Sequence, residues 1–317
     1  MFSLVFIFGC ISGPSDQTNV NESTGEVAKG TFSANILVNG KGTDTISLLS
    51  QQSAQIGLQI RNSGDSELKN VKALVVGCID GVATKNNASI ITVGGQDYFS
   101  WTVTAPSLSQ SEVINCPITI RVCYDKVSKG YTELKFIPEQ YTEAPEPPTS
   151  YSDSDVLSLS FNFPVIRVLC NTTGSTCNVN PNANEISGSL TITNIGPGWI
   201  DYTNYSTSEG LAINTIRGLR INVTADKVKI IKLRDVSGLR GWLSNEDRTL
   251  NLTTSKAGTE ISLLRLVQGK DLYLPIRLNV TDSLIYQSEP KTETLNVEVD
   301  HGYCVDLAQL SATLRGR

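Results

Sequence analysis

Hydrophobic and polar residues alternate with a period of two along short segments that recur through the whole chain. The alternation is clearest at residues 32–38, 56–60, 98–103 and 156–163. Such segments predict β-strands that are buried on one face, and the Gly, Asn and Pro clusters between them predict turns. No segment keeps a helical period over three turns. We therefore expect an all-β protein.

Further strands are expected in both halves of the sequence, each bounded by turn residues. They are residues 68–78, 116–124, 132–137, 166–169, 186–193, 218–223, 228–233, 249–253, 272–280, 294–299 and 303–314. Many short strands at this spacing are typical of a β-sandwich or a β-barrel. The 317 residues are enough for two domains of ordinary size.

Residues 138–155, PEQYTEAPEPPTSYSDSD, interrupt the strand pattern. Their Pro and Glu content and lack of aliphatic residues predict a semi-rigid linker and a domain boundary. The expected domains are therefore residues 30–137 and residues 156–317, and the second carries an insert near residues 206–245.

The two halves also look like a diverged repeat. LQIRNSGDSELKNV (58–71) parallels LTITNIGPGWIDYT (190–203), and CPITIRVCYD parallels LNVEVDHGYCVD. The strand–Asn–x–Gly pattern resembles CARDB-type and related immunoglobulin-like domains of archaeal and bacterial surface proteins. This resemblance implies two tandem immunoglobulin-like β-sandwiches joined by the Pro/Glu-rich linker, with an adhesion, spacer or scaffold role.

The first ten residues, MFSLVFIFGC, form an apolar run that ends at Gly9 and Cys10. Residues 11–29 follow as a polar tether without periodicity. Residues 1–10 resemble the end of a lipoprotein signal, and the run from Gly9 to Gly13 looks like archaeal lipoproteins. The resemblance implies a lipid anchor on Cys10 and an extracellular, membrane-anchored protein. The alternative is a frayed tail with a free thiol, since the segment is short and lacks Lys and Arg.

Six cysteines remain after Cys10, an even number that fits disulfides in an oxidising compartment. In the strand at 116–124, Cys116 shares an apolar, inward face with the even-numbered residues. Cys78 shares a face with Leu74 and Val76 on the earlier strand. Both cysteines are therefore expected to face one core, and we predict a Cys78–Cys116 disulfide.

The other four cysteines are assigned by position. Cys170 and Cys177 close a short polar loop and form the natural local pair. Cys123 and Cys304 remain, and strand parity places both on the polar, outward faces of their strands. A bridge between the two domains is expected from this pair, although a bulge at Gly302 would reverse the parity of Cys304.

Seven Asn-x-Ser/Thr sequons are candidate glycosylation sites in an exported protein. They begin at Asn21, Asn87, Asn171, Asn204, Asn222, Asn251 and Asn279.

Composition and motifs exclude several functional classes. The net charge is −5 and no basic block occurs, which argues against nucleic-acid binding. His301 is the only histidine, so no His-based zinc site can be built. Cys-x-x-Cys, GxGxxG and Walker A motifs are absent. We therefore expect no cofactor, no metal and no enzymatic activity, and His301, beside Asp300, is expected to be a solvated surface residue.

Three tryptophans are the remaining candidates for a binding site. Trp101 alternates with Phe99 and Val103 and is expected in the core. Trp199, after a Gly-Pro-Gly turn, and Trp242, in the insert, are ligand-binding candidates, although both also suit buried loop plugs.

These patterns predict a membrane-anchored surface protein that serves adhesion, envelope architecture or partner binding, with other surface proteins or glycans as partners. The alternatives are a carbohydrate- or ligand-binding module of an envelope complex, and a filament subunit that donates residues 32–38 to a neighbour.

Overall fold

The computed structural model describes residues 31–43, 45–79, 81–138, 141, 146–153, 156–168, 185–200, 220–225, 228–233, 239–244, 249–254, 266–280 and 290–317. All the regular secondary structure in these residues is β-strand, which confirms the all-β class.

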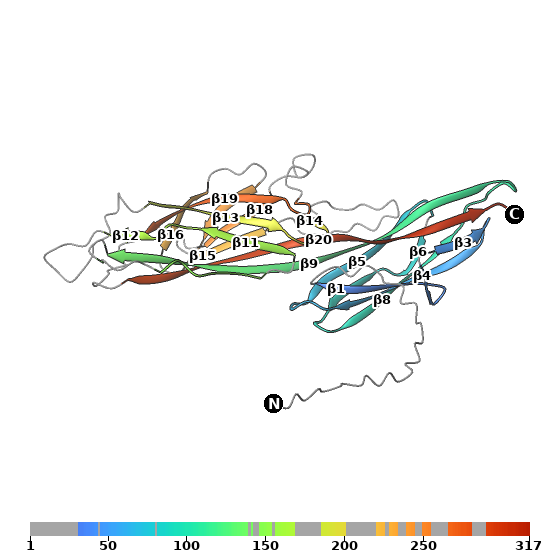
Figure 1. Ribbon diagram of the computed structural model, residues 1–317, viewed down its shortest axis with the longest axis horizontal. Helices are drawn as coiled ribbons and strands as arrows, with labels where there is room; N and C mark the ends of the chain where they lie inside the picture. The colour runs from blue at the N-terminus through green and yellow to red at the C-terminus, as the bar shows by residue number, and fades with distance from the viewer. Residues whose placement is uncertain are drawn as a thin grey trace, which may run out of the picture.

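The strands of the first half pack at one end of an elongated molecule, except that β9 continues into the other end (Figure 1). They are β1 (Phe32–Val38), β2 (Lys41–Gly42), β3 (Thr45–Leu49), β4 (Ser53–Asn62), β5 (Leu68–Gly77), β6 (Gly81–Lys85), β7 (Asn87–Ile91), β8 (Gln96–Thr104) and β9 (Val113–Pro138).

The remaining strands lie mostly at the other end (Figure 1). They are β10 (Ser150–Ser152), β11 (Leu157–Asn162), β12 (Ile166–Val168), β13 (Glu185–Asn194), β14 (Trp199–Ile200), β15 (Arg220–Ala225), β16 (Val228–Leu233), β17 (Leu239–Ser244), β18 (Thr249–Thr254), β19 (Asp271–Val280) and β20 (Lys291–Arg315).

Three sheets build the molecule. The longest has the order β17-β18-β15-β20-β9-β5-β7, with β3, β10, β12 and β14 attached to β9 or β20. A five-stranded sheet, β2-β1-β4-β8-β6, packs against one end of the long sheet, and a four-stranded sheet, β11-β13-β19-β16, packs against the other (Figure 1). The strand order in the sheets at each end is consistent with an immunoglobulin-like sandwich.

β9 and β20 connect the two ends. They have 26 and 25 residues and pair antiparallel from Val113 opposite Arg315 to Phe136 opposite Lys291. At the first end, β9 lies between β5 and the last part of β20, which also pairs in parallel with β3. At the second end, β20 lies between β15 and the last part of β9. Each sandwich is therefore completed by a long strand that begins in the other.

The consecutive arrangement of two sandwiches and a linker is not confirmed. Residues 311–315, near the end of the chain, belong to the sheet of the first half. Part of the expected linker, β10, pairs with residues 130–132 of β9. The expected insert near residues 206–245 contributes β15 to the middle of the long sheet. Alternation identifies the buried face of a strand but not its partner, so this exchange has no local signal.

The buried hydrophobic side chains of both ends form one continuous cluster. Trp101 is 2% exposed and buried with Phe99 and Val103, as expected from their alternation. Figure 1 shows that β9 and β20 pass from one end of this core to the other without interruption.

The prediction that Leu74, Val76 and Cys78 form the inward face of β5 is wrong. Val71 and Ala73 are buried, whereas Val76 is 42% exposed and Cys78 is exposed beyond the strand's end. A register shift between Lys69 and Lys72 in the β5–β9 ladder marks an irregularity near the start of the strand. Residues 73–77 are all apolar if Gly77 is counted as apolar, so the sequence does not show which face of this strand is buried.

Candidate functional site

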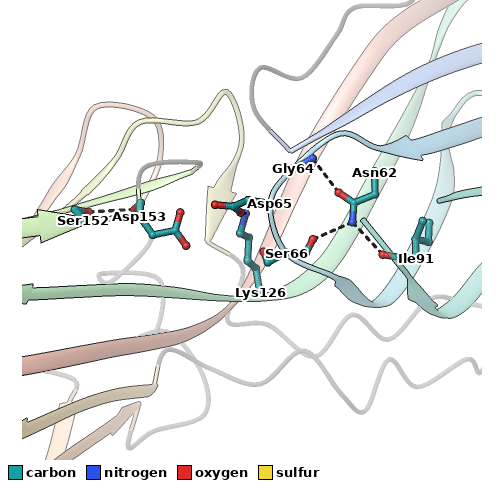
Figure 2. A network of polar contacts seen from close by, with 8 residues as sticks. All are labelled: Asn62, Gly64, Asp65, Ser66, Ile91, Lys126, Ser152 and Asp153. Carbon is teal, nitrogen blue, oxygen red and sulfur yellow. Dashed lines mark hydrogen bonds and ion pairs between the residues drawn. The ribbon is translucent and has the colours of Figure 1, made fainter. Parts of the chain in front are cut away.

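The loop after β4 is held by one buried amide. Asn62 is fully buried, and its Nδ2 donates to the carbonyl oxygens of Ser66 at 2.9 Å and Ile91 at 3.0 Å. Its Oδ1 accepts a hydrogen bond from the Gly64 amide at 3.0 Å. Figure 2 shows these three bonds, which fix the turn between β4 and β5.

The loop after β13 repeats this arrangement. Asn194 is fully buried, and its Nδ2 donates to the carbonyl oxygens of Gly198 at 3.0 Å and Leu266 at 2.9 Å. Its Oδ1 accepts from the Gly196 amide at 3.1 Å. The partners stand two and four residues after the asparagine in both loops, so the sequence repeat reflects one shared loop structure.

Two tyrosines meet where β9 and β20 cross the middle of the molecule. Tyr124 and Tyr303 lie opposite each other, both are 1% exposed, and their ring centroids are 5.8 Å apart. The Tyr303 hydroxyl donates to Asn194 Oδ1 at 3.2 Å and accepts from the Gly198 amide at 2.7 Å. Burial raises the pKa of Tyr303 to about 12, so this hydroxyl remains a donor at neutral pH.

Asn194→Ala is expected to lower the free energy of unfolding by about 2 kcal/mol, because it removes three hydrogen bonds to buried backbone groups and the acceptor of the Tyr303 hydroxyl. Asn62→Ala removes the equivalent bonds and should have a similar effect. Urea unfolding measures both. The matched control is Asn115→Ala, which removes an exposed 2.9 Å bond from Thr313 and should change stability by less than about 0.5 kcal/mol. An equal loss in all three variants would contradict this role for the buried amides.

The expectation that His301 is a solvated residue is wrong. Its side chain is fully buried, and its Nδ1 lies 3.1 Å from the Val299 carbonyl oxygen. Burial lowers the pKa of His301 to about 4, and the charge of Lys126 acts in the same direction. The imidazole is therefore neutral near pH 7. Unbroken parity through Gly302 places His301 on the inward face with Val299 and Tyr303.

Lys126 is the charged residue that the sequence analysis missed. It lies opposite His301 in the β9–β20 ladder, its side chain is fully buried, and its Nζ is 3.9 Å from Asp65 Oδ1. Figure 2 shows Lys126 beside Asp65, at the junction of the two ends. The only sequence signal for the burial of Lys126 is its position in the alternation, because the even-numbered residues of β9 point inward from Cys116 onward.

The structure contains a Cys78–Cys116 disulfide and a Cys123–Cys304 disulfide, which are the same pairs as those predicted. Only Cys116 faces the core as expected. Cys123 and Cys304 lie opposite each other on the face away from the core, as parity predicts, but they are 2% and 0% exposed rather than open to solvent. The β20 irregularity falls between Asp306 and Gln309, not at Gly302.

Trp199 is a packed residue in this structure. It contacts the Cys123–Cys304 pair, and the Arg121 guanidinium carbon lies 4.8 Å from its ring centroid. Arg121 also binds Asp306 through two hydrogen bonds of 2.7 and 3.0 Å. The ring is therefore engaged by its own chain. The backbone of Trp242 lies in β17 opposite Asn251.

A surface cavity of about 550 Å³ lies at the junction of the two ends. β5 and the loop before it, β9 and β20 supply its lining, which includes both charge signs. The charged lining residues are Glu67, Lys69, Asp125, Lys126, Lys129, Glu298 and Asp300. Among the described residues no group of three or more His, Cys, Asp or Glu side chains is arranged to hold a metal ion.

The remaining expected sites fall into two groups. Asn87 is exposed on the edge strand β7, whereas Asn222 is partly buried in β15 between β18 and β20, and Asn251 and Asn279 lie in β18 and β19. The sites that lie outside the described residues are Cys10, Asn21, Cys170, Asn171, Cys177 and Asn204. In the described part of the chain, no helix has the length and apolar character needed to cross a membrane.

Comparisons with known proteins do not assign a family. No protein-family model and no curated protein matches the sequence. Among solved structures, a collagen adhesin from S. aureus aligns over 92% of this chain and 94% of its own, with 7% identity and a TM-score of 0.24. A protein of unknown function from Porphyromonas gingivalis W83 aligns over 88% of this chain and 99% of its own, with 10% identity and a TM-score of 0.20. Secreted serine protease VesC from Vibrio cholerae covers 87% of this chain and 50% of its own, with 7% identity and a TM-score of 0.19. TM-scores this low carry no functional information.

Proposed function

We propose that this chain is a non-enzymatic cell-surface protein that is anchored to the membrane by a lipid on Cys10. The protein would function in adhesion, envelope architecture or partner binding. The observation that carries the proposal is the pair of strands β9 and β20, which run together through both ends of the molecule. A body built in this way holds its two ends at a fixed distance, which suits a spacer or a presenting scaffold.

The dimensions agree with such a role. A strand of 26 residues spans roughly 85 Å at about 3.3 Å per residue. The polar residues 11–29 would reach at most roughly 65 Å when fully extended. Two disulfides, Cys78–Cys116 and Cys123–Cys304, suit an oxidising exterior. An archaeal-type lipoprotein with CARDB-like domains and glycosylated sequons belongs to the same proposal and rests on the sequence resemblance.

Surface proteins or glycans are the proposed partners, and nucleic acid is not. Tyr131 and Tyr151 offer one contact surface, because their rings stack at 5.7 Å between centroids while remaining 37% and 54% exposed. Exposed aromatic side chains supply large contact areas at little entropic cost. This pair supports the second candidate, a carbohydrate- or ligand-binding module. The filament alternative requires β1 to separate from β4 of its own chain, with which it pairs along its whole length, and to pair with a neighbouring subunit instead.

Cys10→Ser is expected to move the protein from the membrane fraction to the medium, because a single thioether-linked anchor would be lost. The unchanged chain should stay with the membrane and react with a membrane-impermeant biotin reagent on intact cells. Intact mass of the extracted protein should show a chain beginning at Cys10 with added lipid mass.

Ser12→Ala, two residues from Cys10, is the matched control and should leave the fractionation unchanged. An unmodified chain that begins at Met1 and stays inside the cell would overturn the proposal. The released Cys10→Ser protein also serves for a glycan array, in which specific binding would favour the carbohydrate-binding module over the spacer.

A further inference from the structure

The Cys123–Cys304 disulfide lies at the middle of the two long strands. The two cysteines are opposite each other in the β9–β20 ladder, with a Cα–Cα distance of 4.1 Å. They point away from the main core, where a sheet face is normally open to water. Their exposures of 2% and 0% therefore require a cover on this outer face.

Two partly buried side chains, Leu74 of β5 and Trp199, pack against the pair, and the segment Gly198–Trp199 is the part of this cover that lies over β20. Trp199 begins β14, whose backbone pairs with Cys304, and its side chain contacts the two cysteines. Gly198 allows this close approach, because a Cβ on it would lie 2.0 Å from the Cys304 carbonyl oxygen. The Gly198 amide also donates to the buried Tyr303 hydroxyl at 2.7 Å, so the segment is bonded down beside the disulfide.

Arg121 also contacts the indole. It stands two residues before Cys123 on β9, and its guanidinium carbon lies 4.8 Å from the Trp199 ring centroid. The bidentate contact with Asp306 on β20 orients the guanidinium plane. A cation over an indole is attracted by the electron-rich face of the ring. Trp199 thus contacts both the disulfide and an ion pair that bridges β9 and β20.

We propose that Trp199 and Arg121 form a shield that keeps thiols away from the Cys123–Cys304 disulfide. Reduction of this bond needs an external thiolate to attack one sulfur, which forms a mixed disulfide and releases the other cysteine as a thiolate. A second external thiol then attacks the mixed disulfide and frees the first cysteine, while the two external thiols leave as their own disulfide. The rate depends on access to a sulfur, and the indole occupies that approach. The inference does not rest on the proposed cell-surface function.

The chain supplies its own reference bond. Cys78 is exposed, so the Cys78–Cys116 disulfide has no equivalent cover. In the native protein, dithiothreitol is expected to reduce Cys78–Cys116 first. Trp199→Ala should accelerate the reduction of Cys123–Cys304 on the order of tenfold or more and leave the rate at Cys78–Cys116 unchanged. Timed alkylation and peptide mass mapping give both rates from one sample.

Conservative variants separate shielding from general loosening. Trp199→Phe should keep most of the protection, and Arg121→Gln should lose part of it. Tyr273→Ala removes an aromatic residue that is 60% exposed on β19 and should leave both rates unchanged. Equal acceleration at both disulfides in Trp199→Ala would mean that global unfolding controls reduction, and it would overturn the proposal. Reduction of the two bonds at the same rate in the native protein would overturn it as well.

Discussion

Proteolytic cleavage between β9 and β10 is expected to leave both fragments in one particle. A specific protease site placed within residues 142–145 would divide the chain after β9, which stays with the first fragment, while β20 stays with the second. Because β9 and β20 pair along their whole length, size-exclusion chromatography should show an unchanged elution volume after cleavage. A denaturing gel without reductant should show one band, and two bands should appear only after reduction of Cys123–Cys304.

The Cys123→Ser/Cys304→Ser double variant is the control for the covalent link. Its cleaved fragments should still elute together under native conditions but separate on a denaturing gel without reductant. Two tandem domains on a linker behave differently, because cutting the linker releases each domain. Separate elution of the fragments of the disulfide-free variant under native conditions would therefore contradict the shared strands.

Lowering the pH from about 6.5 to 4 is expected to remove about 3 kcal/mol of stability through His301 alone. Burial holds the folded-state pKa of His301 near 4, below its ordinary value of 6.5. The neutral form favours the folded state, so this contribution is complete above pH 6.5 and is lost as the pH falls toward 4. The facing charge is Lys126 on β9, and Tyr303 on the same strand stays neutral in this range.

His301→Gln supplies the comparison, because glutamine is polar, similar in length and does not titrate. Urea unfolding of both proteins at several pH values gives the difference between their free energies of unfolding. Carboxylates that titrate in the same window contribute equally to both curves and cancel in the difference. A difference that stays constant from pH 7 to pH 4 would mean that His301 becomes protonated as readily in the folded protein as in the unfolded chain.

Strand positions were accessible from the sequence because alternation is a local signal. The segments expected at 32–38 and 228–233 coincide with β1 and β16, and the inward face of residues 116–124 is correct. Residues 32–38 and 116–124 bury one face against a core, so their period appears directly in the residue types.

Each long strand was expected as two shorter ones, 116–124 with 132–137 and 294–299 with 303–314, and a glycine lies between the two in each case. Gly130 separates two apolar segments and suggests a turn, yet it lies inside β9. A Cβ at Gly130 would lie 2.8 Å from the Tyr151 carbonyl oxygen and 2.9 Å from Leu159 Cδ1. The glycine therefore permits close approach of neighbouring chain segments rather than a change of direction.

Strand parity alone was not enough to predict the buried histidine and lysine at the junction. His301 and Lys126 lie opposite each other near the middle of β20 and β9, and both are buried. Their burial follows from the antiparallel register of β9 and β20, which brings two distant segments together. A single histidine beside Asp300 is otherwise typical of a solvated strand end.

The exchange of strands also sets an order for folding. β3 receives its partner, and the first part of β9 its second partner beside β5, only when residues 311–315 have been synthesised. The central disulfide joins cysteines separated by 181 residues. Contacts so distant in sequence slow folding, and they leave unpaired strand edges exposed in the meantime. The first sandwich therefore cannot complete its folding before β20 has been synthesised, and the folding of the two ends is coupled.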